Sequence, residues 1–508
     1  MSTSKSRVPQ RYLLLPPRGL QTSAAPASAH LGTLLTSLQP TLALPRGLAG
    51  AGMRIVDSVH ENGIKLVEMD AAAMRRLREQ APGLRIVPEV FYRTARQPIP
   101  TVLGPAAPRS AKRRAAAGGR ARAATTAAAA TVLNFVGSDG QPVAGATVVA
   151  FTDFAQRLGA QGKTKADGRV SLKLGTAKRV QRLYVYPVDS LWPLLKKNVA
   201  LPRTKAFTLR AIDLAATDAL QYFAALAPSG NGAGVVVGVV DTGVGPHRDV
   251  PVAGGANTVT GENEADYQDN GDQHGTHVGG IVGARGLAGH GMRGLAPAVT
   301  LRSYRVFGKG SDGASNFAIA KAIDRAVADG CDLINMSLGG GPADPATSAA
   351  IADARVAGVA VVCASGNDGA ATVSEPGADS RAVAVGAFGR KGLAPADSVS
   401  ASDVGRAGKD KRNFMADFSN HGTAIDFAGP GVGIVSTVPV DRWAVMDGTS
   451  MASPALAGAA ARLLSADAAL LKSARDQQRS DAILQLAFRA AKLLGFGAEY
   501  EGSGWPMK

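Results

Sequence analysis

Cysteine is scarce in this chain, with only two residues among 508. Two thiols are too few for a disulfide framework, so a small disulfide-stapled fold is excluded. Cys331 and Cys363 both lie inside apolar runs, and we interpret them as small buried hydrophobic residues. The length and the 45% apolar content allow more than one sizeable core, typical of two to four domains.

Long hydrophobic runs are also missing. No apolar stretch reaches the ~18 residues that a membrane-spanning helix needs. The N-terminal "YLLLPP" is too short for the core of a signal peptide, and the apolar stretch at 31–50 is interrupted by Pro40. No clear signal peptide is identified, so secretion and a cytoplasmic location both stay open.

Acidic residues are sparse in the first quarter of the sequence. Residues 1–131 hold 19 Lys and Arg against 6 Asp and Glu, a balance of 19 − 6 = +13 out of the total of +16. The remainder therefore carries only +3. Much of the excess lies in "RSAKRRAAAGGRARAA" at 109–124, a composition typical of a solvated linker. This distribution argues against nucleic acid as the partner.

Changes in composition divide the N-terminal half into segments. Residues 1–52 show no steady period, which predicts a disordered or loosely structured segment. Residues 53–97 alternate strand and helix patterns and predict a small α+β unit, only marginally stable alone. The Ala/Arg/Gly-rich stretch at 98–130 is predicted to be a linker. Short strands separated by "SDGQPVAG" and "KADG" turns predict a small β-sandwich over 131–212. It resembles the carboxypeptidase-regulatory-like or Cna-B-like modules.

Residues 213–508 have a different pattern of apolar residues. Near-continuous apolar runs such as "GVVVGVV" and "GVAVVCAS" alternate with helical patterns such as "SNFAIAKAIDRAVADG". Strands of this kind are buried on both faces, which predicts an α/β fold whose parallel sheet is covered by helices on both sides. Ligands bind such sheets beyond the carboxyl ends of the strands. Polar residues at those ends are therefore the candidates for a functional site.

Two of the seven histidines lie three residues apart in "GDQHGTHVGG". His274 and His277 could share a zinc ion, but a zinc site needs three or four ligands, and no Cys or helical Glu accompanies them. We favour one functional histidine, His274 at the start of the segment, and one packed histidine, His277. The tripeptide "HGT" recurs at 421–423 without the buried helix, so its context carries the argument.

Three further polar residues lie at strand or helix ends. Asp241 ends the first buried strand in "DTGVG", where it could be a simple turn residue. Asp-Thr-Gly is also the catalytic motif of aspartic proteases, but those enzymes need two such carboxylates, and the sequence has no second Asp-Thr-Gly. Ser450 precedes a long Ala/Gly/Leu helix, where a serine is often only an N-cap. Asn367 follows another buried strand in "ASGND". Together with His274, they supply a carboxylate, a base, a nucleophile and a hydrogen-bond donor for an oxyanion.

The chain resembles the subtilisin-like serine proteases, the subtilases of peptidase family S8. The resemblance covers roughly residues 213–505. It depends on six motifs in the family order: "VVDTGV", "HGTHVGG", "GLAP", "INMSLGG", "ASGNDG" and "GTSMASP".

The resemblance implies a role for each candidate residue. Asp241, His274 and Ser450 would form the catalytic triad, Asn367 would be the oxyanion donor beside the Ser450 amide, and His277 would be the non-catalytic histidine. Two segments would line the substrate cleft, and their members are Ser337, Leu338, Gly339, Gly340, Ala364, Ser365 and Gly366.

The resemblance implies a serine endopeptidase that acts through an acyl-enzyme on protein or peptide substrates. The alternative is an inactive relative that serves as a binding module. No cofactor is expected, and no calcium ligands can be assigned. Residues 53–97 resemble the family's inhibitor-like propeptide, so we predict a self-processed precursor that is cut between Arg93 and Ala130. Two departures stand out: Ala455 replaces the usual histidine after "SMASP", and minimal subtilases lack the segment 131–212.

Overall fold

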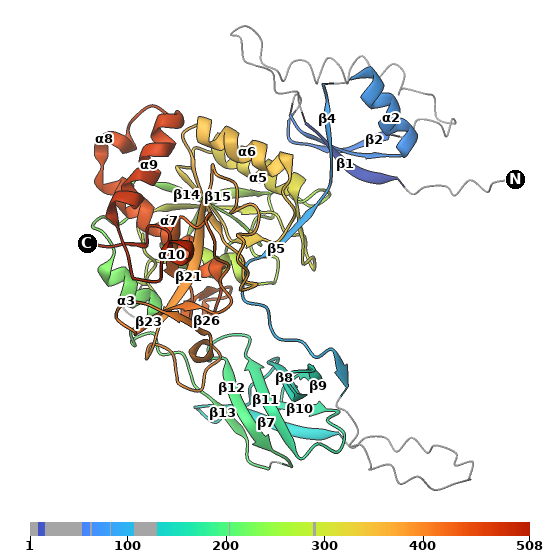
Figure 1. Cartoon of the computed structure of the whole chain (residues 1–508), viewed down its shortest axis with the longest axis vertical. Coiled ribbons are helices and arrows are strands. Elements are labelled where there is room, and N and C mark those ends of the chain that lie inside the picture. The colour runs from blue at the N-terminus through green and yellow to red at the C-terminus, as the bar shows by residue number, and fades with distance from the viewer. Residues whose placement is uncertain are drawn as a thin grey trace, which may run out of the picture.

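The computed structural model describes residues 9–15, 53–60, 63–81, 83–105, 130–202, 204–287 and 291–508. Three bodies follow one another along the chain (Figure 1): an α+β unit, a two-sheet unit and a large α/β domain. Most of the predicted N-terminal segment 1–52, and residues 106–129 of the predicted linker, lie outside the described ranges. Within those ranges, no helix combines the length and apolar character that a membrane crossing requires.

A nine-stranded sheet forms the centre of the α/β domain. Its order is β15-β16-β14-β18-β20-β21-β23-β22, and β24 also pairs with β21. All the neighbouring strands from β15 to β21 are parallel, as is the β21–β24 pair. Strand β23 is antiparallel to both of its neighbours, β21 and β22. The bounds are β14 Val236–Asp241, β15 Val252–Asn257, β16 Thr300–Arg305, β18 Leu333–Met336, β20 Ala360–Ala364, β21 Val383–Arg390, β22 Val404–Ala407, β23 Asn413–Ala416 and β24 Phe427–Pro430.

Helices cover both faces of this sheet, as the unbroken apolar strands predict. Along β14, Val237 and Val239 join one buried cluster with helices α3, α4, α7 and α9, whereas Val240 joins another with α5 and α6. Alternate side chains of a strand point to opposite faces, so each strand needs apolar residues at every position. The helices are α3 Ala219–Leu226, α4 His274–Gly283, α5 Asn316–Ala328, α6 Pro345–Val356, α7 Thr449–Ala466, α8 Ala468–Leu471, α9 Gln477–Ala490 and α10 Ala498–Glu501.

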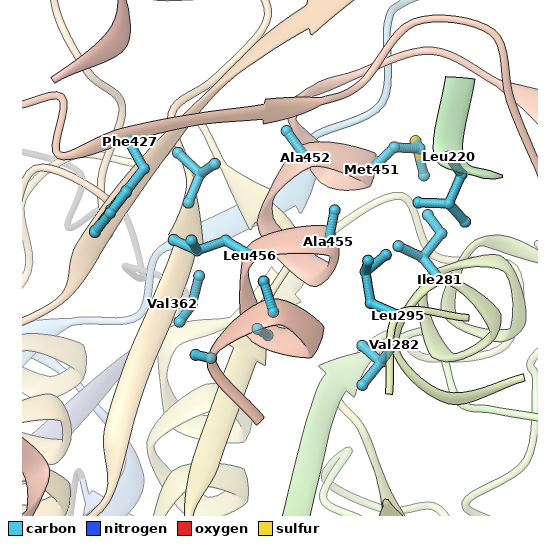
Figure 2. Close-up of a cluster of buried hydrophobic side chains, with 14 of the residues drawn as sticks. Leu220, Ile281, Val282, Leu295, Val362, Phe427, Met451, Ala452, Ala455 and Leu456 are labelled. Atoms are coloured by element: carbon cyan, nitrogen blue, oxygen red, sulfur yellow. The ribbon is translucent and has the colours of Figure 1, made fainter. Parts of the chain in front are cut away.

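Helix α7 lies inside the domain rather than on its surface. Small residues allow this position, because they let neighbouring strands and helices approach on every side. Figure 2 shows α7 between Phe427 and Val362 on one side and α4 with Ile281 on the other. Ala455 is fully buried in this cluster, so the residue that departs from the family pattern is a packing residue.

The α+β unit consists of four strands and one helix, with sheet order β2-β3-β1-β4. Its elements are β1 Gln10–Leu15, β2 Met53–Ser58, β3 Lys65–Met69, α2 Ala71–Gln80 and β4 Arg85–Pro88. The prediction that 1–52 lacks structure is wrong at β1, which pairs with both β3 and β4. Leu13, Leu14 and Leu15 are fully buried there. The run "YLLL" is therefore part of a central strand whose partners, Lys65–Met69 and Arg85–Pro88, lie far along the sequence.

The α+β unit is docked on helices α5 and α6 (Figure 1). Leu13 and Leu66 from its sheet share a buried cluster with Phe317 of α5 and Ala346 of α6. At the edge of this contact, Asp57 accepts hydrogen bonds from Lys321 and Thr260. The apolar contact provides the larger part of the attraction, because ion pairs that remain partly exposed contribute little.

Beyond β4, the chain enters the large domain as an extra strand. Strand β5, Phe91–Thr94, lies between β17, Ala314–Ser315, and β19, Leu338–Gly339, and is antiparallel to both. Tyr92 is almost fully buried, and its hydroxyl donates to Asp344 at 2.7 Å. The segment 53–97 is thus divided between two bodies, a sheet of its own and a strand that belongs to the large α/β domain.

Residues 130–212 form two sheets around one buried core. One sheet has the order β10-β7-β13 and the other the order β12-β11-β8-β9-β6. The strands are β7 Thr131–Gly137, β8 Thr147–Asp153, β9 Leu158–Lys163, β10 Arg169–Leu172, β11 Arg179–Tyr186, β12 Leu194–Ala200 and β13 Phe207–Leu209. The predicted linker 98–130 also contributes β6, Gly104–Pro105, which pairs with β9. Its boundary is therefore wrong at that point, because two residues give no periodic signal.

The two-sheet unit is fixed against the large domain by apolar and polar contacts. Trp192 is buried with Val435 and Val445, on the hairpin of β25, Ile434–Val438, and β26, Arg442–Met446. The Leu195 amide donates to the Asp397 carbonyl at 2.9 Å. The Lys196 ammonium lies 2.7 Å from the Asp397 carboxylate. Near the C-terminus, β27, Ala491–Lys492, pairs antiparallel with β28, Trp505–Pro506.

Candidate active site

Asp241 and His274 meet at the carboxyl edge of the parallel sheet. Asp241 is the last residue of β14, His274 is the first of α4, and Nδ1 of the imidazole lies 2.7 Å from Oδ1 of the carboxylate. Both side chains are fully buried. This approach needs glycine at the next position, because a Cβ on Gly275 would overlap the carbonyl oxygen of Gly243. The glycines of "DTGVG" and "HGT" thus allow the pair to form.

Ser450 lies in the first turn of α7, whose N-terminus faces the same edge. Its side chain is buried, and its hydroxyl donates to the Ser337 carbonyl oxygen at 3.0 Å. The other imidazole nitrogen of His274, Nε2, is buried and has no hydrogen-bond partner among the described residues. The structure therefore brings Asp241 and His274 into direct contact and directs the serine hydroxyl to Ser337.

The carbonyl oxygen of Ala95, just beyond β5, lies between two donors. The Ser450 amide donates to it at 2.9 Å, and the Asn367 side-chain amide donates to it as well. Asn367 is held in this orientation because its Oδ1 accepts from the amide and hydroxyl of Thr449, at 2.9 and 3.0 Å. Two fixed donors on one carbonyl oxygen are the arrangement that stabilises an oxyanion.

Comparison with known proteins identifies the family of this chain. The profile of the Subtilase family, peptidase S8, matches residues 232–499. Subtilisin DY from Bacillus licheniformis is 37% identical over 239 residues, which span 46% of this chain and 78% of that protein. The chain belongs to the subtilase family. Subtilisin BL and Subtilisin Savinase from Lederbergia lenta are 37% and 36% identical over 230 residues, 45% of this chain and 76% of each relative. This subtilase is a serine endopeptidase.

In this subtilase, strand β5 and Ala95 lie directly beside Ser450. The Ala95 amide donates to the Ser337 carbonyl at 3.0 Å, and β5 pairs with Leu338 and Gly339. Gly448 lies directly under the segment, where a Cβ would come within 2.8 Å of the Ala95 oxygen. The glycine of "GTS" therefore gives a peptide backbone room to reach Ser450.

The predicted cleft residues divide into two groups. Ser337, Leu338 and Gly339 contact β5 or Ala95 directly, and Gly340 follows them. The amides of the second group point elsewhere, since Ser365 donates to Val385 and Gly366 to the Thr449 hydroxyl. Ala364 ends β20. As cleft residues, Ala364, Ser365 and Gly366 stay a prediction from the resemblance.

His277, the second histidine of "HGTH", lies one turn into α4 and is fully buried. Its Nε2 is 3.1 and 3.2 Å from the carbonyl oxygens of Ile434 and Ala444. Burial lowers the pKa of His277 to about 3, with a smaller contribution from His274. A neutral imidazole that donates to these backbone carbonyls ties α4 to the β25–β26 hairpin.

Beyond Ala95, the chain continues over two carboxylate-bearing residues that the motifs did not single out. The Arg96 guanidinium lies 3.2 Å from Asp272, and the Gln97 amide donates to the Asp447 carbonyl at 2.8 Å. Asp447 directly precedes the "GTS" motif, so the sequence shows that it lies close to Ser450. No feature of the sequence predicts its role. In the described part of the chain, no three His, Cys, Asp or Glu side chains are grouped as metal ligands.

Proposed function

We propose that Asp241, His274 and Ser450 are the catalytic triad of this serine endopeptidase. The buried 2.7 Å contact would orient the imidazole and stabilise its protonated form. The Ser450 hydroxyl would turn from the Ser337 carbonyl towards Nε2 of His274, give up its proton and attack the substrate carbonyl carbon. The C–N bond would then break, His274 would protonate the leaving amine, and water would hydrolyse the acyl-enzyme. The unpartnered Nε2 supports this role.

The oxyanion would be held by the Ser450 amide and the Asn367 side chain. In support, both groups donate to the Ala95 carbonyl oxygen. We expect Asn367→Ala to lower kcat about 10²–10³-fold, because one preorganised donor is lost where negative charge develops. Steady-state kinetics on a peptide substrate would measure it, with Asn263→Ala in an exposed loop as the control. A loss confined to KM would contradict the role.

We infer that the precursor cuts itself between Ala95 and Arg96. One observation carries this proposal: the Ala95 carbonyl occupies the two-donor site beside Ser450, with β5 laid along the cleft as an added strand. The bond lies inside the predicted window from Arg93 to Ala130. Until the unit 10–95 dissociates, it would also act as the inhibitor of the cleft that its last residues fill.

Arg96→Pro is expected to leave the precursor at full length. Proline turns the bond into a tertiary amide and fixes φ of the residue that carries the leaving nitrogen, so proton transfer to that nitrogen loses its geometry. Intact mass and N-terminal sequencing would read the outcome, and the wild type should begin with Arg96-Gln97-Pro98. The exposed Arg93→Ala keeps the strand backbone and should be cut as in the wild type. A mature wild type that begins elsewhere would place the cut at another bond.

A further inference from the structure

The first residue after the proposed cut has an acidic partner on the α/β domain. Nη2 of Arg96 lies 3.2 Å from Oδ2 of Asp272. The other carboxylate oxygen, Oδ1, is buried and has no hydrogen-bond partner within the described ranges of the chain. The Asp272 carboxylate therefore meets Arg96 with one oxygen, and its second oxygen can still accept from a donor that enters the same place.

The loop before α4 fixes Asp272 close to the proposed reaction centre. The Asp272 amide donates to the Asn270 side chain at 3.0 Å, and the next amide, that of Gln273, donates to the Asp269 carboxylate at 3.1 Å. His274, the proposed base, follows as the first residue of α4. A carboxylate on a loop held in this way keeps its place while different substrates pass it, so it can discriminate between them.

The side chain after the cut lies in a cavity that both bodies line. Arg96 and Asp272 face this cavity of about 330 Å³, and Thr147 and Lys163 of the two-sheet unit line it as well. The surrounding protein strengthens the interaction between the two charges relative to open water. The pair is still partly exposed, with 42% of the Arg96 side chain and 33% of the Asp272 side chain accessible, so its effect is modest and depends on salt.

We propose that Asp272 selects the first residue after the scissile bond, favouring Arg or Lys and disfavouring Glu or Asp. This inference rests on the proposed cut, because it takes the place of Arg96 as that of the substrate residue. A basic side chain would make the contact that Arg96 makes, whereas an acidic one would meet a like charge. We expect kcat/KM for Arg to exceed that for Glu about tenfold at low salt and less than about threefold in 1 M NaCl.

The test compares quenched peptides that differ only in Arg or Glu at this position, hydrolysed by the processed wild type, Asp272→Asn and Asp266→Asn. Asp266 lies in the same loop but faces Arg305, so its variant is the matched control. The wild type and the control should show the tenfold ratio, and Asp272→Asn should show less than about twofold. Each ratio comes from one enzyme, which cancels any effect of the lost charge on His274. Equal ratios in the wild type and Asp272→Asn would overturn the inference.

A second measurement uses the rate at which the intact precursor cuts itself. Arg96→Glu should slow this step about tenfold in the wild type but less than about threefold when Asp272→Asn is also present. The control, Arg93→Glu, reverses an exposed charge on β5, before the bond, and should leave the rate close to that of the wild type. The same loss of rate from Arg96→Glu with and without Asp272→Asn would overturn the inference.

Failure of the proposed function gives a different result from failure of this inference. Cutting of the Ser450→Ala precursor by itself would remove the proposed nucleophile, and a processed wild type that does not begin with Arg96 would remove the proposed cut. When Ser450→Ala stays intact and the wild type begins with Arg96, the two ratios decide the role of Asp272 alone.

Discussion

Ser450→Ala should abolish peptide hydrolysis while the fold stays intact. Without the hydroxyl no acyl-enzyme can form, and loss of a triad nucleophile typically lowers the rate by 10⁴–10⁶. The side chain is buried at the start of α7, where alanine fits without a clash, and the Ser450 amide that faces Ala95 remains. Turnover of a quenched peptide, corrected for contaminating protease, measures the effect.

The same variant reports on the precursor. Ser450→Ala should stay at full length, whereas the wild type should shorten. Ser453→Ala is the matched control, one turn further along α7, and should retain most of its activity. More than a thousandth of wild-type turnover in Ser450→Ala would contradict the nucleophile. Identical shortening of the two chains would mean that another protease makes the cut.

Asp241→Asn should lower kcat about 10⁴-fold and leave KM nearly unchanged. The amide keeps the size of the side chain, but it cannot stabilise an imidazolium at His274, and it favours the wrong tautomer of the ring. The effect should be large here, because the pair is fully buried and water cannot replace the carboxylate. The measurement is kcat on a peptide substrate at saturating concentration.

Asp249→Asn is the control for this prediction. Asp249 is as buried as Asp241 and follows the same strand, and its Oδ1 accepts the Leu287 amide, which an asparagine can also do. Its activity should stay close to that of the wild type. If Asp241→Asn kept a tenth of wild-type kcat, Asp241 would be a structural residue rather than the partner of the base.

The sequence predicted the α/β domain and placed the candidate site residues at strand and helix ends, because both depend on local chemistry. Unbroken apolar strands, a glycine on either side of the Asp241–His274 contact and a helix of small residues after Ser450 leave few alternatives. These are short patterns in which every residue has a physical task. The same holds for His277, whose neutral, buried state follows from its place among small apolar residues.

The parts that the sequence did not predict depend on distant partners. In the sequence, β1 is a short isolated apolar run, and only its pairing with β3 and β4 identifies it as a strand. The two residues of β6 form a strand only because they pair with β9. Ala95 belongs to no motif, and the two donors that meet its carbonyl oxygen, on Ser450 and Asn367, lie more than two hundred residues later. Periodicity cannot report such contacts, because each partner contributes only one or two residues.

The anchoring of β6 has a kinetic consequence for the cut. Gly104 and Pro105 are paired in the two-sheet unit, which is itself fixed to the protease domain. Once the Ala95–Arg96 bond is cut, the new amine would be tethered eight residues from that anchor, within about 30 Å. Confinement of this kind gives an effective concentration in the millimolar range. Resynthesis of the bond would then compete with hydrolysis, and departure of the unit 10–95 would make the cut irreversible.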